Sequence, residues 1–283
     1  MKATPPIEAL FTVYFACAAV AAAALDAPVS SPLGAALVCG TLAVSRARNF
    51  FRGSAPWRAV QDWLPLPLVV LAYRQMDLPA SQAAQRQFGE RVLWLDDIVL
   101  SRVGLGEAVR AGGPAVAGAF ELVYAMTYLV PVAAVAMLYL SGRRDRVPRF
   151  HYTFLAGTLA AYALLPLFPS ESPRLLFPTH WPPPDTSLRL VNIWVLDHAD
   201  IHRSVCPSGH VAAACSAALG MQVALPERTR YAAVLGTMAA VIAAATVVGR
   251  YHFVVDVVAG IAVSAVAWRV TSAVLRLGEM RTG

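Results

Sequence analysis

Two short segments near the C-terminus carry the residues of this chain best suited to chemistry. The first is Ser208-Gly209-His210, and the second places His252 and Asp256 four positions apart. On a helix, that separation puts both side chains on one face, where a carboxylate can orient an imidazole and make it a better nucleophile. A helix that begins after Ser208 would point free backbone N–H groups at an anion. The two segments together predict a phosphate pocket with two histidines.

Each signal also has a purely structural interpretation. Ser208 can cap a helix that happens to begin with a histidine, and a His-x3-Asp pair is often no more than a structural hydrogen bond. Both motifs, however, lie at the ends of apolar segments on one predicted face of a membrane, where ionisable side chains are costly to keep. The combination therefore favours a catalytic site.

The composition places this site in a membrane. Apolar residues make up 58% of the 283 residues and charged residues only 14%, and the mean hydropathy is +0.57. These values are typical of a polytopic membrane protein. The net charge of +6 does not indicate a nucleic-acid partner, because the arginines lie in short loops between apolar runs. The four cysteines form no CxxC pair, so we expect no disulfide framework and no metal site.

We expect an all-α transmembrane bundle of six to eight spans. The apolar segments are residues 7–25, 32–45, 63–73, 115–140, 152–168, 207–225, 231–248 and 253–275. The first mimics a signal peptide, but further spans follow at once and favour an uncleaved helix. Residues 78–113 predict an amphipathic helix at the membrane surface, with Asp96 and Asp97 solvated on it. We divide the chain into N-terminal transmembrane and interfacial helices, 1–110, and a catalytic bundle, 111–283.

The arginines indicate the orientation. With eight spans, the loops that hold them fall on the same side as Lys2, which the positive-inside rule assigns to the cytoplasm. The stretch 74–113, the Pro-rich loop 169–205 and the turn 249–251 then face the periplasm or exterior, together with the site. Alanine- and arginine-rich usage indicates a bacterial plasma membrane. The arginines are Arg46, Arg48, Arg52, Arg58, Arg143, Arg144, Arg146, Arg149, Arg228, Arg230, Arg276 and Arg281.

The two motifs resemble signature motifs of the type 2 phosphatidic acid phosphatase superfamily. Ser208-Gly209-His210 is similar to its second motif, and His252 with Asp256 is similar to its third. Upstream, the segment 168–174 resembles the Pro-Arg element that stands for the first motif in the inositol phosphorylceramide synthase-like (inositolphosphotransferase) branch. The His-Phe pair before Asp256 is also like that branch. The resemblance covers residues 121–260, about half of the chain.

The resemblance implies a role for each matching residue. His252 would attack phosphorus and form a phosphohistidine, Asp256 would hold its other nitrogen, and His210 would protonate the leaving alkoxide and later activate the acceptor. No metal or other cofactor is implied, because fixed donors supply the positive field, and the substrate would be a lipid phosphate drawn from the surrounding membrane lipids. The donors expected to bind the phosphoryl oxygens are Arg174, Ser208, Gly209 and Arg250.

Two cations of the phosphatase branch are absent. Leu167 stands where its first motif has a lysine, and Thr246 stands where its third has an arginine. This departure favours the phosphotransferase-like branch but leaves both water and a headgroup alcohol open as acceptor. The absence also motivates a non-catalytic lipid-binding or transport module, against which the intact histidines argue. A zinc hydrolase lacks a fourth ligand at suitable spacing. The oligomeric state is not indicated.

Other polar residues allow two interpretations. Glu121, Tyr124 and Tyr128 share one helical face, where they either line a headgroup cavity or form a packed seam. The outer loop also holds three histidines whose spacing matches no standard metal site and which we expect to be solvated: His180, His198 and His202.

Overall fold

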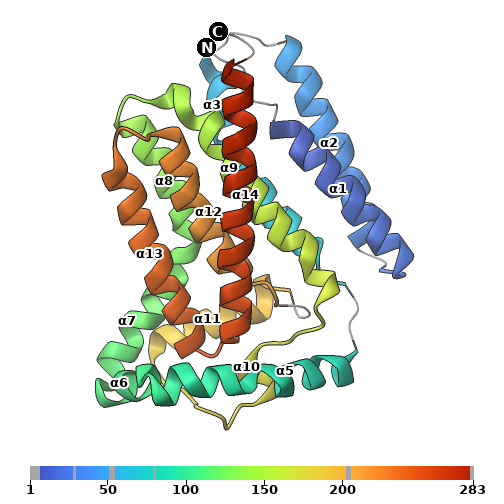
Figure 1. Cartoon of the computed structure of the whole chain (residues 1–283). Coiled ribbons are helices and arrows are strands. Elements are labelled where there is room, and N and C mark those ends of the chain that lie inside the picture. Colours follow the sequence, from blue (N-terminus) through green and yellow to red (C-terminus); the bar gives the residue numbers. More distant parts are fainter. Residues whose placement is uncertain (1–6, 28–29, 51–54, 79–80, 202–204, 281–283) are drawn as a thin grey trace.

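A computed structural model describes residues 7–27, 30–50, 55–78, 81–201 and 205–280; Lys2, Arg52, His202 and Arg281 lie outside these ranges. The described residues form helices joined by turns and short loops, which confirms the all-α prediction (Figure 1). The helices are α1 Ile7–Ala24, α2 Ser30–Phe50, α3 Ala55–Trp63, α4 Pro65–Arg74, α5 Gln82–Asp97, α6 Leu105–Ala111, α7 Gly113–Ala125, α8 Val130–Leu140, α9 Val147–Leu164, α10 Pro173–Leu176, α11 Ser187–Ala199, α12 Gly209–Ala224, α13 Thr229–Val248 and α14 Val254–Met280.

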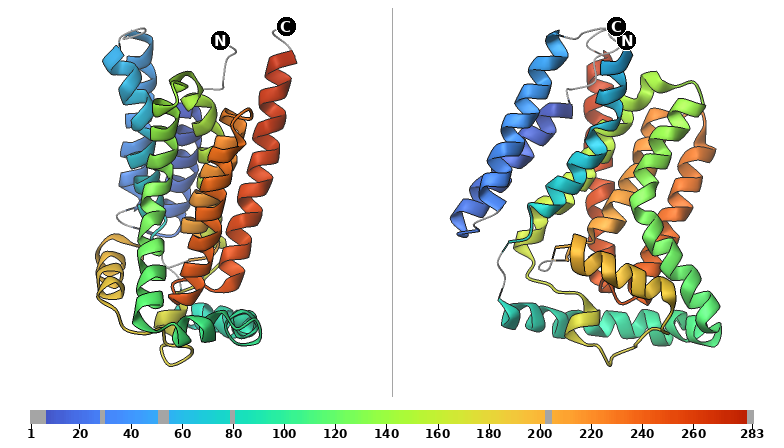
Figure 2. Two further views of the ribbon diagram at one scale, coloured as in Figure 1. Left: turned by 90° about the vertical axis from the view of Figure 1, so that its left-hand side faces the viewer. Right: turned by 180° about the vertical axis from the view of Figure 1, so that it is seen from behind.

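Five helical stretches in the described ranges are long and apolar enough to cross a membrane. They are Ile7–Ala24, Gly113–Leu140, Arg144–Leu167, Thr229–Val248 and Val254–Met280. Helices α2, α4 and α12 run alongside them, whereas α5 lies across one end of the bundle (Figures 1 and 2). The chain is therefore an integral membrane protein, and the count of six to eight spans stays a prediction.

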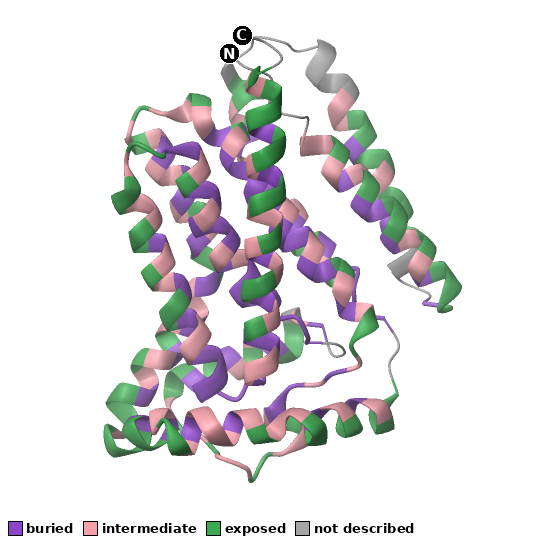
Figure 3. Ribbon diagram, in the orientation of Figure 1, coloured by how far each residue is buried: buried purple, intermediate pink, exposed green. Residues whose placement is uncertain are grey.

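Small residues let the central helices α9, α12 and α14 approach closely. Much of α9 and α12 is buried in the bundle (Figure 3). A Cβ added at Gly157 of α9 would lie 2.2 Å from Oγ of Ser216 on α12. That same hydroxyl donates to Oγ of Ser264 on α14 at 3.1 Å. Close packing with hydrogen bonds across helices is how membrane helices associate, since lipid provides no hydrophobic force between them. These contacts fix α12 and α14, which carry the two motifs.

Prolines divide two of the predicted segments. The segment 63–73 starts at the end of α3 and continues as α4, whose first residue is Pro65. The segment 115–140 contains a 3₁₀ turn, Met126–Leu129, between α7 and α8. Pro131 lies just after this turn, and a proline has no N–H to continue the α-helical hydrogen bonds. The break matters for the site because it sets the direction of Tyr128.

The short apolar segment 32–45 is found as predicted and lies within the longer helix α2. The expectation of a loop over 169–205 needs correction, because this stretch contains the helix α11 after its proline-rich part. Thr186 caps α11, and its hydroxyl accepts the N–H of Arg189 at 3.1 Å.

The buried carboxylate of Glu121 fastens α11 to the bundle. Its Oε1 accepts from Nη1 of Arg189 at 3.1 Å, and its Oε2 accepts from Nδ2 of Asn192 at 2.7 Å. Tyr251, in the turn between α13 and α14, donates its hydroxyl to the same Oε2 at 2.5 Å. Glu121 is only 4% exposed. Its partners are therefore protein groups from two elements, α11 and the α13–α14 turn, and the packed-seam interpretation is the one that holds for this residue.

Removing that carboxylate should destabilise the fold. In Glu121→Ala, Arg189 would keep its charge in a buried site with its carboxylate partner gone. Breaking a buried pair in this way costs about 3–5 kcal/mol, and we expect the free energy of unfolding to fall by that amount in detergent. The matched control is Glu90→Ala, which removes an exposed i,i+4 pair with Arg86 and should cost less than about 1 kcal/mol. Equal losses in the two variants would contradict the prediction.

Candidate active site

Two histidines meet at one end of the bundle. His210 lies in the first turn of α12, and His252 lies in the turn between α13 and α14. The Nδ1 atom of His210 is 3.3 Å from the Nε2 atom of His252. Both side chains are buried. The fold thus brings together two motifs that are 42 residues apart in the chain.

The turn that holds His252 lies at the opposite end of the bundle from the arginine-rich turns. In Figure 1, the connections α8–α9 and α12–α13 lie at the upper end of the bundle, and the α13–α14 connection lies at the lower end beside α5. Arg143, Arg144 and Arg146 belong to the first of these connections, and Arg228 belongs to the second. These four arginines lie at the opposite end of the bundle from the histidine pair, which is the arrangement that the sequence predicts for the loops that hold them.

Asp256 lies close to His252, but the two residues do not share one face of a helix. Helix α14 begins at Val254, so His252 precedes it and the expectation of a shared helical face is wrong. The cause is local: Oδ2 of Asp256 accepts the N–H of Phe253 at 2.9 Å and caps the helix start. That oxygen lies 3.6 Å from Nδ1 of His252, beyond a hydrogen bond. Catalytic hydrogen bonds of this kind often tighten only when substrate binds.

The starts of α12 and α14 are joined directly. The N–H of Ser208 donates to the carbonyl of Asp256 at 2.9 Å. A Cβ at Gly260 would lie 2.8 Å from the carbonyl oxygen of Ser208, so only glycine permits this approach. The hydroxyl of Ser208 accepts the N–H of Val211, which confirms that it caps α12. A role of Ser208 or Gly209 in binding phosphate stays a prediction.

Tyr128 contacts the other nitrogen of His210. Its hydroxyl lies 3.2 Å from Nε2, and Oγ1 of Thr127 donates to the carbonyl of His210 at 3.4 Å. Both residues belong to the 3₁₀ turn that precedes Pro131. Tyr128 therefore contacts the histidine pair, and the interpretation that it lines a headgroup cavity stays a prediction. A partner on Nε2 determines which tautomer presents a proton or a lone pair toward His252.

We expect Tyr128→Phe to lower kcat by about three- to tenfold, the value of one hydrogen bond. The phenyl ring preserves the packing, so KM should change little. Tyr152→Phe is the control, because that hydroxyl lies on the far side of α9, in an apolar cavity away from the histidines. Steady-state kinetics of both variants test the prediction, and an unchanged kcat in Tyr128→Phe would remove Tyr128 from the site.

Two cavities of opposite character adjoin the histidine pair. One, of about 50 Å³, is lined by His252, Arg174 and Asp200, with further polar groups from Glu171, Ser172, Asp197 and Tyr251. The other, of about 350 Å³, is lined by His210 and by apolar side chains of α4, α8 and α9. Asp200 lines both cavities. A polar headgroup and an apolar chain can therefore be bound on the two sides of the histidines.

Arg174 faces the polar cavity. Its Nη2 donates to Oδ1 of Asp197 at 3.1 Å, and its backbone N–H donates to the carbonyl of Arg250 at 3.0 Å. Its Nε is buried and has no hydrogen-bond partner among the described residues. A buried donor without an acceptor is costly, and a phosphoryl oxygen would supply one.

Arg250 is fully buried and pairs with a carboxylate of α5, the helix that lies across one end of the bundle. Its Nη1 donates to Oδ2 of Asp96, and its Nε and Nη2 have no partner among the described residues. The expectation that Asp96 is solvated is wrong: it is 0% exposed because it binds both Arg250 and the N–H of Val254. The neighbouring Asp97 is partly exposed and pairs with His180 at 3.0 Å.

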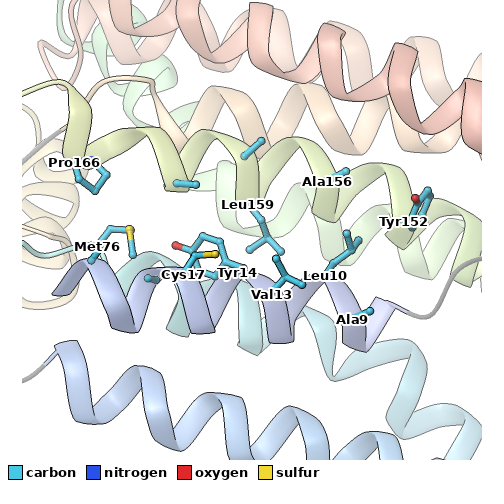
Figure 4. Close-up of a pocket in the computed structure, with 14 residues that line it drawn as sticks. Ala9, Leu10, Val13, Tyr14, Cys17, Met76, Tyr152, Ala156, Leu159 and Pro166 are labelled. Atoms are coloured by element: carbon cyan, nitrogen blue, oxygen red, sulfur yellow. The ribbon is translucent and has the colours of Figure 1, made fainter. Parts of the chain in front are cut away.

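Other parts of the structure offer less chemistry. Within the described ranges, no group of three or more His, Cys, Asp or Glu side chains is placed to hold a metal ion. A cavity of about 670 Å³ lies between α1 and α9 (Figure 4). It is larger than the cavities at the histidines, but its lining holds no histidine, acid or base. Its size therefore does not make it the reactive site.

The fold and the site define an integral membrane protein with a buried histidine pair between a polar and an apolar cavity. Residues 101–270, more than half of the chain, match the PAP2 superfamily. Comparison with curated proteins and with solved structures found no match. The chain belongs to the PAP2 superfamily, whose members are usually phosphatases or phosphotransferases and act on phosphate esters, often lipid phosphates.

Proposed function

We propose that the protein transfers a phosphoryl-containing group from a membrane lipid phosphate, through a phosphohistidine on His252, to water or a hydroxyl acceptor. The observation that carries this proposal is the 3.3 Å contact between His210 and His252 where the polar and apolar cavities adjoin. The apolar cavity suits the lipid chain, and the polar cavity suits the phosphoryl group.

The proposed transfer takes place in two steps. First, Nε2 of His252 attacks phosphorus, the P–O bond to the lipid breaks, and His210 gives its proton to the leaving oxygen. Second, His210 takes a proton from the acceptor hydroxyl, whose oxygen attacks phosphorus and breaks the P–N bond. A phosphorus and an oxygen atom must fit between the two histidines in each transition state. Substrate binding therefore has to separate the two rings from their present contact.

The remaining groups support the charge that spreads over the phosphoryl oxygens. Arg174 and Arg250 offer buried N–H donors that have no partner among the described residues. The first N–H groups of α12, at Gly209 and His210, add the positive end of a helix. Asp256 would orient His252 and stabilise its imidazolium form. Fixed donors of this kind lower the barrier because they need no rearrangement during the reaction.

Water is the acceptor that the present cavity supports best. A water molecule needs roughly 10–15 Å³ of cavity volume. The polar cavity of about 50 Å³ therefore has room for only a few waters. Hydrolysis would make the enzyme a lipid phosphate phosphatase. The second candidate, an inositolphosphotransferase-like enzyme, is supported by the Pro-Arg element and by Leu167 and Thr246 in place of the phosphatase cations.

The placement of the reaction also belongs to this proposal. The arginine-bearing turns at the opposite end support a cytoplasmic position for that end. The histidine pair would then face the periplasm or exterior of a bacterial plasma membrane. The family match begins at residue 101, which supports a division into N-terminal helices, 1–110, and a catalytic bundle, 111–283.

A single-turnover assay separates the candidates. Purified protein in lipid nanodiscs is given radiolabelled phosphatidate, polyprenyl diphosphate and other lipid phosphates, each with and without myo-inositol-containing acceptors. Inorganic phosphate as the product supports the phosphatase, and label in a new lipid supports the transferase. Activity should survive exhaustive chelation; loss of activity that Zn²⁺ restores would favour a zinc hydrolase. If no substrate turns over, the non-catalytic lipid-binding or transport module is the better description.

A further inference from the structure

Helix α5 contacts the turn 250–254, which holds His252, through one buried carboxylate. Oδ2 of Asp96 accepts from Nη1 of Arg250, and Oδ1 accepts the backbone N–H of Val254 at 2.8 Å. These two partners lie two residues before and two residues after His252 in the chain. Asp96 thus holds the turn on both sides of the proposed nucleophile without touching the nucleophile itself.

The turn needs such support because its backbone is unfavourable. Arg250 has φ 61°, in the left-handed region that side chains other than glycine rarely adopt. Conformations of this kind are unfavourable and persist only where the surroundings hold them. The carbonyl of Arg250 also accepts the N–H of Arg174 at 3.0 Å. A shift of the turn would therefore displace both the histidine and a proposed phosphate-binding arginine.

Packing between α5 and the turn is close. A Cβ added at Gly89 of α5 would lie 2.8 Å from Cε2 of Phe177 and 3.1 Å from Cζ of Phe253, the residue after His252. Burial raises the pKa of the Asp96 carboxyl, and the Arg250 guanidinium and the Val254 N–H oppose that rise. The carboxylate is thus kept by specific partners and not by solvent.

Resting on the proposed function, we propose that Asp96 is a positioning residue for phosphoryl transfer, which places His252 opposite His210 by holding the turn 250–254. The interfacial helix α5 is then part of the enzyme's active structure in addition to lying at the membrane surface. This role differs from phosphate binding, because Asp96 carries the wrong charge for an anion and is occupied by protein donors.

Asp96→Asn tests the proposal. Asparagine keeps the size and can still accept the Val254 N–H, but it cannot pair with the charge of Arg250. A displacement of about 1 Å at a reacting group can cost on the order of 100-fold, so we expect kcat to fall about 100-fold with little change in KM. The rate of phosphohistidine formation should fall equally. Asp97→Asn, which changes the partly exposed neighbour that pairs with His180, should stay within about twofold of wild type.

If Asp96→Asn fails to fold, a comparison of two further variants tests the proposal. Arg250→Gln is measured with and without Asp96→Asn, so that in the double variant neither charge is left unpaired. If Asp96 acts through Arg250, the double variant should be no slower than Arg250→Gln alone. Losses that multiply would show independent action and overturn the proposal, as would wild-type kcat in a folded Asp96→Asn protein. Activity that does not depend on His252 would instead overturn the proposed function.

Discussion

Replacing His252 with alanine is expected to lower turnover of every lipid phosphate substrate by on the order of 10⁴- to 10⁶-fold, the loss seen when a covalent nucleophile or its base is removed. The physical reason is that, in the proposed mechanism, the His252 imidazole forms the covalent bond to phosphorus that divides the reaction into two easier steps, and alanine cannot form it. Single-turnover assays with ³²P-labelled lipid, followed by alkaline trapping of protein-bound phosphate, measure both the rate and the intermediate.

His180→Ala is the matched control, since it removes a histidine of the outer loop whose partner is Asp97. It should retain wild-type rates and wild-type trapping of phosphate. Thermal unfolding of both variants shows whether the fold is intact. Substantial activity in a folded His252→Ala protein would exclude the phosphohistidine mechanism, and full binding of lipid without turnover in wild type would favour the non-catalytic module.

His210→Gln is expected to lower kcat on alkyl lipid phosphates by about 10³-fold, within the usual range for general acid–base catalysis. Glutamine keeps a polar side chain near His252 but does not exchange a proton with the leaving oxygen. An aryl phosphate, whose leaving group needs no proton, should bypass the defect in the first step only. We therefore expect phosphohistidine to accumulate in His210→Gln with the aryl substrate and not with the alkyl lipid.

The outcome distinguishes the two histidines. Equal losses on aryl and alkyl substrates, with no accumulated intermediate, would mean that His210 does not act as the acid. Tyr128→Phe provides an intermediate case, because it keeps His210 and removes only the hydroxyl on Nε2. Its smaller loss should be similar for both substrates.

Much of the architecture follows from local pattern. Long apolar runs have to become helices in a membrane, since a helix satisfies its own backbone hydrogen bonds, and the helices at Gly113–Leu140 and Val254–Met280 were foreseen within a few residues. The ionisable residues at the ends of such runs identified His210 and His252 as a candidate pair for the same reason. The helix start at Ser208 was equally predictable, because capping depends on neighbours in the chain.

The sequence does not predict the environment of a side chain whose partner is distant in the chain. Asp96 looked like a solvated surface acid, yet its partner Arg250 is 154 positions away. Glu121 had two possible environments until α11 supplied Arg189 and Asn192. The sequence does not predict α11 within the proline-rich loop. Helix propensity is weak evidence over 13 residues, because tertiary contacts decide whether such a short helix is stable.

Hydropathy and motif spacing are local properties, and they suffice to predict a helical membrane protein with two histidines and a carboxylate in family-like motifs. The 3.3 Å contact between the histidine nitrogens and the burial of Asp96 beneath the turn 250–254 follow from the fold, because each joins residues that are distant in the chain. Gly157 and Gly260 let α9, α12 and α14 approach closely, and Gly89 lets α5 pack against Phe253. Helix packing sums many small contacts between remote residues, and no single stretch of sequence contains that sum.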